Sequence, residues 1–231
     1  MNPPSPNPQH VLAPHLRSLK LDVYVPLDSS AIHILLDNLN LPNLHELQLT
    51  AVGYLTMFFG NTNFSSFILR STCLLRSLSL SGFLLNDDDL LQCMQILPSL
   101  EVFQIWDSLR PDHRVADQTI TNQTIRNLTP NISPNLTLLP NLRELWISSS
   151  RLIIDAFELH SMMCARWRPG DAGFGPGVAQ LRSVTISADW RHDETEKLEL
   201  LLLSELIAEG MEVSLSLGTF GVPQSRLSIK S

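Results

Sequence analysis

Three consecutive carboxylates, Asp87, Asp88 and Asp89, are the most obvious candidate for a cation site in this sequence. They follow Asn86, a residue type that favours the N-cap of a helix, so we expect them in a first helical turn. Consecutive helical residues point about 100° apart and cannot converge on one ion. The helix macrodipole stabilises acidic groups at this end. We therefore predict a helix start here and not a metal site.

Three histidines have a possible metal ligand four residues away on a predicted helix: His33 with Asp37, His160 with Cys164 and His192 with Glu196. A zinc site needs at least three protein ligands, and none of these pairs has a third one nearby in sequence. We expect surface polar residues and, at His160, a packed cysteine beside a surface histidine.

Motifs for nucleophilic or phosphate chemistry are absent: the sequence contains no G-x-S-x-G, H-E-x-x-H or Walker pattern. A glycine cluster, Gly170, Gly173, Gly175 and Gly177, follows a predicted helix and does not lead from a strand into a helix N-terminus. A flexible loop is therefore expected there, not a phosphate cradle. We predict that the chain is not an enzyme and needs no cofactor or metal.

The spacing of the leucines predicts the strands and helices that position the other residues. The pattern Leu-x-x-Leu-x-Leu, with Val, Ile or Phe allowed, occurs six times, starting at Leu16, Leu44, Leu75, Leu100, Leu142 and Leu181. Pro42, Pro98 and Pro140 precede three of these copies at the same place. Each strand and helix pair has an apolar face that only a neighbouring unit can cover. The sequence predicts an α/β leucine-rich-repeat solenoid of about six to seven irregular repeats, with a curved parallel sheet on the concave face and helices outside.

The repeats divide the chain into three parts. Residues 1–14 are a Pro-rich disordered linker, residues 15–217 the leucine-rich-repeat domain, and residues 218–231 a C-terminal tail. Helices are expected near residues 64–69 and 121–128. Asp155 and Glu158 have capping-box spacing, as do Asp193 and Glu196, and Gly210 is expected to end the last helix.

Composition limits the partners. The 231 residues are 44% hydrophobic, which suits one folded domain, and the net charge of −7 disfavours nucleic acid and anionic membranes. Three cysteines without a C-x-x-C pattern fit a reducing compartment. The sequence shows neither a signal peptide nor a membrane span. We expect an intracellular protein, cytoplasmic or nuclear, whose partner is another protein.

Two stretches, LPNLRELWISSS and LRSLSLSGFLLNDDDLLQCMQILPSLE, resemble the C-terminal repeat region of fungal F-box proteins with leucine-rich repeats. The similarity covers residues 41–190. The resemblance implies a substrate receptor of a ubiquitin ligase, in which the F-box binds an adaptor and the repeats bind the target. An F-box motif is not seen in this chain, so adaptor binding requires an F-box supplied elsewhere.

Strand alternation predicts the protein-binding surface. The third, fifth and seventh places of each copy point away from the helices, and they include Trp106 and Trp146 among polar residues such as Gln48, Gln104 and Glu144. We predict that these five residues bind a protein partner on the concave face. Alternatively, the long segment after Trp106 covers both rings as part of the fold.

Two other functions stay open: a hydrolase on a parallel α/β sheet, and a truncated gene product without independent function. An enzyme on such a sheet would have a pocket with ionisable groups at the carboxyl ends of the strands. The first repeat is preceded only by the linker, so its sheet edge should be uncovered and the chain should self-associate.

Overall fold

A parallel β-sheet is the central element of the computed structural model, which describes residues 10–24, 30–52, 57–58, 61–84, 87–106, 120–130, 137–149, 155–169, 177–188, 203–217 and 225–228. Its parallel strands are β2 (Ser18–Tyr24), β4 (Glu46–Val52), β6 (Ser77–Ser81), β8 (Val102–Trp106), β9 (Glu144–Ser149), β10 (Ser183–Ala188) and β11 (Glu212–Leu217). Each strand pairs with the next of these strands along the chain. The expected α/β class with a parallel sheet is confirmed.

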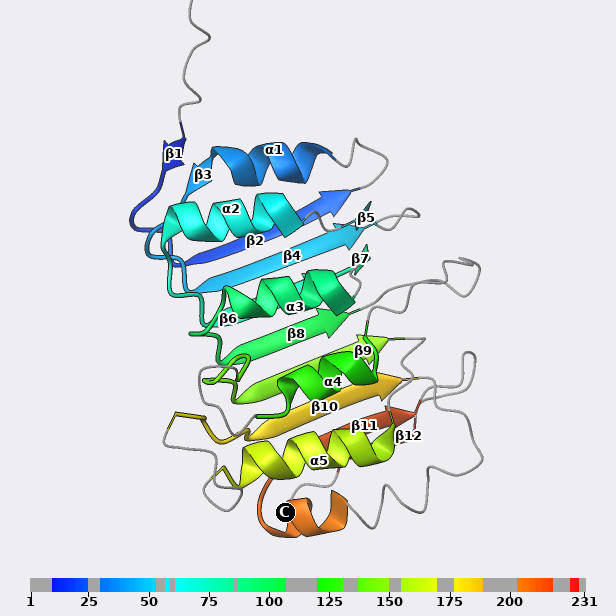
Figure 1. The fold of residues 1–231 in the computed structure, drawn as a ribbon. Helices are drawn as coiled ribbons and strands as arrows, with labels where there is room; N and C mark the ends of the chain where they lie inside the picture. Colours follow the sequence, from blue (N-terminus) through cyan, green and yellow to red (C-terminus); the bar gives the residue numbers. More distant parts are fainter. Residues whose placement is uncertain are drawn as a thin grey trace, which may run out of the picture.

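The described helices cover one face of this sheet (Figure 1). They are α1 (Ser30–Asn38), α2 (Asn61–Ser71), α3 (Asp87–Gln95), α4 (Asn122–Leu128) and α5 (Ala156–Trp167), and residues 203–208 form a further short helix. Each labelled helix contacts the next one in sequence. Strands and helices therefore form two layers that run along the molecule in chain order.

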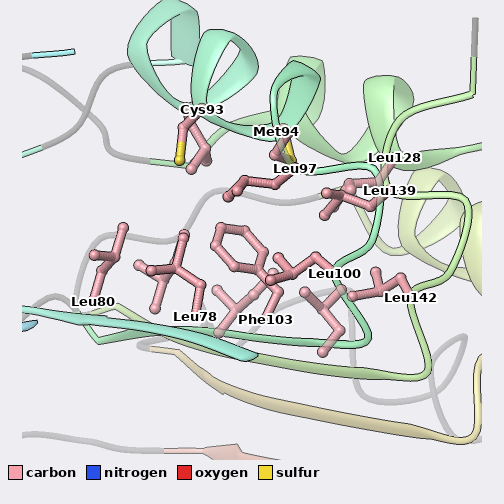
Figure 2. Packing of buried hydrophobic residues seen from close by; sticks show 14 of the residues in the cluster. Leu78, Leu80, Cys93, Met94, Leu97, Leu100, Phe103, Leu128, Leu139 and Leu142 are labelled. Carbon is pink, nitrogen blue, oxygen red and sulfur yellow. The ribbon is translucent and has the colours of Figure 1, made fainter. Parts of the chain in front are cut away.

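The core lies between these two layers. The strand register aligns equivalent apolar residues into one row: Leu19, Leu47, Leu78, Phe103, Leu145, Val184 and Val213. All except Leu19 are buried. Figure 2 shows Phe103 packed among leucines from the strands and from the segments that lead into them, beneath Cys93 and Met94 of α3. The leucine spacing thus places its apolar residues in one continuous core.

The same backbone bonds recur where the chain enters successive strands. The Arg17 carbonyl accepts the amides of His45 and Glu46 from the next strand, at 2.8 and 3.0 Å. The carbonyls of His45, Arg76, Glu101 and Arg143 each accept two amides in the same way. This repetition holds neighbouring units in one register.

The prolines that recur in the pattern occupy turns. Leu44 donates to the Leu41 carbonyl, Leu100 to that of Leu97 and Leu142 to that of Leu139, so each Leu-Pro-x-Leu closes a tight turn. Asn43 and Asn141, the residues after two of these prolines, donate to the carbonyls of Pro14 and Pro98 in the preceding units. The proline thus lies in an equivalent turn before each of these three strands, and in two of the turns an asparagine also bonds to a preceding segment.

Short strands lie in both ranges that the sequence predicts to be linker and tail. β1 (Val11–Leu12) pairs with β3 (Leu39–Asn40), and β12 (Ser225–Ser228) pairs antiparallel with β11 at the sheet edge. Another two-stranded pair, β5 (Met57–Phe58) with β7 (Phe83–Leu84), lies outside the main sheet. These strands are too short to give a hydrophobic pattern, so the sequence alone does not reveal them.

The cap expected at Asp155 forms, the helix expected near residues 121–128 forms with a cap of its own, and one expected bond does not form. Thr121 caps α4, and Asp155 caps α5 by accepting the amides of Phe157 and Glu158. The Glu158 carboxylate, however, binds Arg126 of α4 at 2.8 Å instead of completing a capping box. A salt bridge to a neighbouring helix thus replaces the local bond. The other expected caps, at 86 and at 193–196, lie outside the described residues.

Gly210 ends the last helix as expected. Its φ is 99°, and its amide donates to Ile207 while the Met211 amide donates to Leu206, which together form a Schellman motif. Leu206 and Met211, the apolar pair typical of this motif, are both buried. The backbone at this position is left-handed, so glycine is needed there.

Replacing Gly210 by alanine should lower the free energy of unfolding by about 1 kcal/mol, the cost of a side chain in the left-handed region. A Cβ there would meet no atom within 4 Å, so steric contact adds nothing. Gly177→Ala is the matched control, since its Cβ also meets nothing within 4 Å and its φ is not left-handed. Urea denaturation measures both variants. Equal stability of the two variants would contradict the role of Gly210.

Candidate protein-binding face

The sheet has a second face, on which none of the described helices lies (Figure 1). Along each strand the residues between the buried leucines point to this face, as the alternating exposure of β4 and β8 shows. The register aligns them in rows. One row contains Lys20, Gln48, Ser79, Gln104, Trp146, Thr185 and Ser214.

The structure brings four of the five predicted binding residues together. Gln104 and Trp106 lie on β8, and Glu144 and Trp146 lie on the adjacent strand β9. Gln48 is in the same row as Gln104 but two strands away, with Ser79 of β6 between them. Glu144 is exposed, and the other four side chains are half-buried.

The two tryptophan rings are in direct contact. Trp106 pairs with Ser148 and Trp146 with Gln104, so the tryptophans occupy diagonal positions as the spacing predicts. Their ring centroids are 6.2 Å apart with an interplanar angle of 78°, an edge-to-face contact of the kind worth about 0.5–1.5 kcal/mol. Both rings keep some exposed surface, while residues 107–119, the segment that would cover them in the alternative interpretation, lie outside the described residues.

Two polar atoms on this face have no hydrogen-bond partner in the described part of the chain. They are the Trp146 indole Nε1 and the Ser79 hydroxyl, which flank Gln104 in the same row. A buried polar group without a partner costs about 1–3 kcal/mol. Ser79 was not predicted as a site residue, because a serine between leucines in a strand gives no signal by itself.

Asp87 connects two helices, a role that the sequence does not reveal. Its carboxylate accepts the Thr121 amide at 3.3 Å and the hydroxyls of Thr121 and Thr124, although these residues are more than thirty positions away. Thr121 caps α4, so the carboxylate joins the start of α3 to the start of α4. The helix start expected at Asp87 is confirmed, and its first carboxylate has this additional role.

Arg166 is a second residue that sequence analysis missed. It lies in α5 with 0% of its surface exposed, and it donates to the carbonyls of Leu128, Leu138 and Leu139 at 2.6, 2.6 and 3.1 Å. Burial lowers the pKa of Arg166 to about 10, so the guanidinium is still charged at neutral pH. The side chain holds the end of α4 and the turn into β9 against α5.

Metal binding has no support in the described residues, where no group of three His, Cys, Asp or Glu side chains could hold an ion. His160 and Cys164 are in contact as expected, with Nε2 and Sγ 3.2 Å apart. Burial raises the pKa of all three cysteine thiols, that of Cys93 to about 12. The three thiols are thus kept protonated at neutral pH.

Comparisons with protein-family models, curated proteins and solved structures gave no match to this chain. Among the described helices, none is long and apolar enough to cross a membrane.

Proposed function

We propose that this chain is a leucine-rich-repeat solenoid that acts as a non-enzymatic protein-interaction scaffold. Its curved sheet would bind a protein partner on the concave face, around Gln104, Trp106, Glu144 and Trp146, with Gln48 at the margin. In line with the sequence resemblance, the role would be substrate recognition for an F-box-type ubiquitin ligase. Adaptor binding would then need an F-box from outside this chain.

The regular connections between units support the repeat assignment. Successive parallel strands lie side by side in chain order, the strand-entry bonds recur at each step, and the Leu-Pro-x-Leu turns link neighbouring units. A doubly wound enzyme fold places helices on both faces of its sheet. Here the described helices lie on one face, which favours a solenoid.

The tryptophan pair is the observation that carries the functional proposal. Tryptophan is enriched among the residues that contribute most to protein–protein binding. These two rings are half-buried in contact with each other, so little side-chain freedom is lost when a partner covers them. A partner that moves the Gln104 side chain could also supply hydrogen bonds to Ser79 and Trp146.

The hydrolase alternative has less support. Catalysis on a parallel sheet uses ionisable side chains at the carboxyl ends of the strands. The last residues of the parallel strands are Tyr24, Val52, Ser81, Trp106, Ser149, Ala188 and Leu217, of which Tyr24 alone is ionisable. Of the carboxylates on the open face of the described strands, Glu46, Glu144 and Glu212 lie at strand starts, and Asp22 lies two residues before the end of β2.

A double substitution, Trp106→Ala with Trp146→Ala, tests the proposal. We expect capture of a partner from an extract of the source cells to fall at least tenfold, while stability falls by less than about 3 kcal/mol because both rings are only half-buried. Phe157→Ala is the matched control, since this aromatic residue of α5 is 71% exposed on the helical layer. It should change neither property.

Three outcomes would change the proposal. Unchanged capture by the double variant would exclude the tryptophans as the binding site. A stability loss above about 3 kcal/mol would show that they are packing residues. If the captured protein carries no ubiquitin in cells that express an F-box fusion of this chain, the scaffold remains but the ligase role is wrong.

A further inference from the structure

Strand β2 is the least covered strand of the parallel sheet. Among the described strands it has a neighbour on one side only, β4. Its inward residues Leu19, Leu21 and Val23 are partly buried, whereas Leu47 and Leu49 of β4 are 1% and 0% exposed. The far end of the sheet differs, because β12 covers the edge of β11.

Exposed apolar side chains are concentrated at this same end. Of the ten large hydrophobic residues found exposed in the described chain, seven belong to the first repeat or its neighbours: Val11, Leu12, Leu16, Tyr24, Ile34, Leu35 and Val52. Ile34 and Leu35, 60% and 39% exposed, lie on α1. An apolar end of this kind next to an open strand edge is typical of an interface.

The free backbone groups of β2 can be assigned by residue. The Arg17 carbonyl points to β4, where it accepts two amides. Every second residue of a strand directs its amide and carbonyl to the same neighbour, so those of Leu19, Leu21 and Val23 also point to β4. The amides and carbonyls of Ser18, Lys20, Asp22 and Tyr24 therefore point to the open edge. A second strand can form backbone hydrogen bonds with this edge only if residues whose own amides and carbonyls are free lie opposite these four.

Charge selects one way for a second copy of β2 to pair antiparallel. Three central registers form the backbone hydrogen bonds between the two strands and keep the apolar side chains of both copies on one face of the sheet. In one of them Lys20 meets Lys20, and in another Asp22 meets Asp22, and like charges directly opposite are unfavourable. In the third, Lys20 of each copy meets Asp22 of the other, Leu21 meets Leu21 and Leu19 meets Val23.

We propose that the chain forms a two-fold symmetric dimer through antiparallel pairing of β2 in this third register. The pairing continues the sheet across the symmetry axis and places both helical layers on the same side, so Ile34 and Leu35 of the two α1 helices face each other. Lys20 Nζ and Asp22 Oδ2 are 3.9 Å apart within one strand. In the dimer the Lys20 and Asp22 side chains of both copies lie together at the interface, and each positive charge has negative neighbours. The paired edge of β2 is separated from β8, the strand of Trp106, by β4 and β6, although Lys20 and Asp22 lie on the same face of the sheet as the two tryptophans.

Charge reversal tests the register. Lys20→Asp and Asp22→Lys should each raise the dimer dissociation constant about tenfold or more, because two opposite-charge pairs become two like-charge pairs. An equimolar mixture of the two variants should dimerise again, as a heterodimer. The double variant Lys20→Asp/Asp22→Lys should dimerise like the wild-type chain. Sedimentation velocity in a buffer of low ionic strength measures all five samples.

The side chains of Lys20 and Asp22 are 58% and 40% exposed, so the variants should fold normally, with unchanged circular dichroism. A wild-type chain that stays monomeric at every concentration would overturn the proposal. Self-association that ignores the charge reversals would show that another surface is used. Neither result affects the proposed partner site, because partner capture depends on Trp106 and Trp146.

Discussion

Replacing Arg166 by methionine is expected to lower the free energy of unfolding by about 3 kcal/mol. Methionine fills the space of the side-chain stem but cannot donate to the carbonyls of Leu128, Leu138 and Leu139. A buried acceptor that loses its donor costs about 1–3 kcal/mol, and the Leu139 carbonyl keeps one bond, from the Leu142 amide. Chemical denaturation followed by circular dichroism measures the change.

Arg126→Met is the control for this variant. Arg126 lies in the neighbouring helix α4, is 55% exposed and forms one salt bridge with Glu158, so its loss should cost less than about 1 kcal/mol. Arg166→Lys should also be destabilised, since one ammonium group cannot replace a planar guanidinium that donates from three nitrogens to three carbonyls. A loss below about 1 kcal/mol for Arg166→Met would contradict its structural role.

Asp87→Ala is expected to cost about 2–3 kcal/mol, the second-largest effect. The substitution removes the acceptor of three hydrogen bonds from Thr121 and Thr124, and the Thr124 side chain is buried with 2% exposure. Hydrogen bonds to a charged group contribute about 1.5–3 kcal/mol. The start of α4 would lose its connection to α3, and thermal and urea unfolding should both report the loss.

The variant Asp88→Ala is the control that distinguishes the stability lost with the α3–α4 connection from the stability lost by removing a charge near the helix macrodipole. Asp88 is exposed in the same first turn of α3, so it experiences the same dipole, an effect of about 0.3–1 kcal/mol. If both variants lose the same small amount, the macrodipole alone explains the acidic turn and the link to α4 contributes nothing.

The sheet could be predicted from the sequence because its signal is local. Leu-x-x-Leu-x-Leu places its last two apolar residues on one side of a strand and its first in the segment that leads into that strand. The same places recur in the next unit, so register follows from spacing. For this reason the diagonal contact of Trp106 with Trp146 was predictable. Their exposure was not, because it depends on which side chains and segments lie over them.

The residues missed by sequence analysis share one property: their partners are distant in the chain. Asp87 binds Thr124, 37 residues away, and Arg166 binds Leu128, 38 residues away. Glu158 was expected to bond within its own helix turn, yet it pairs with Arg126 across 32 residues. Irregular unit lengths hide such pairs, because the spacing from one unit to the next is not constant.

The central claim is that a protein partner covers the sheet face at the tryptophan pair. A photo-crosslinking amino acid at position 104, between Ser79 and Trp146 in the row, tests this most directly, with the same group at position 69 on α2 as control. Leu69 is 66% exposed, so it is fully available to any protein that binds the helical layer. We predict a crosslinked partner from position 104 and none from position 69; a partner that crosslinks from position 69 but not from position 104 would contradict the account.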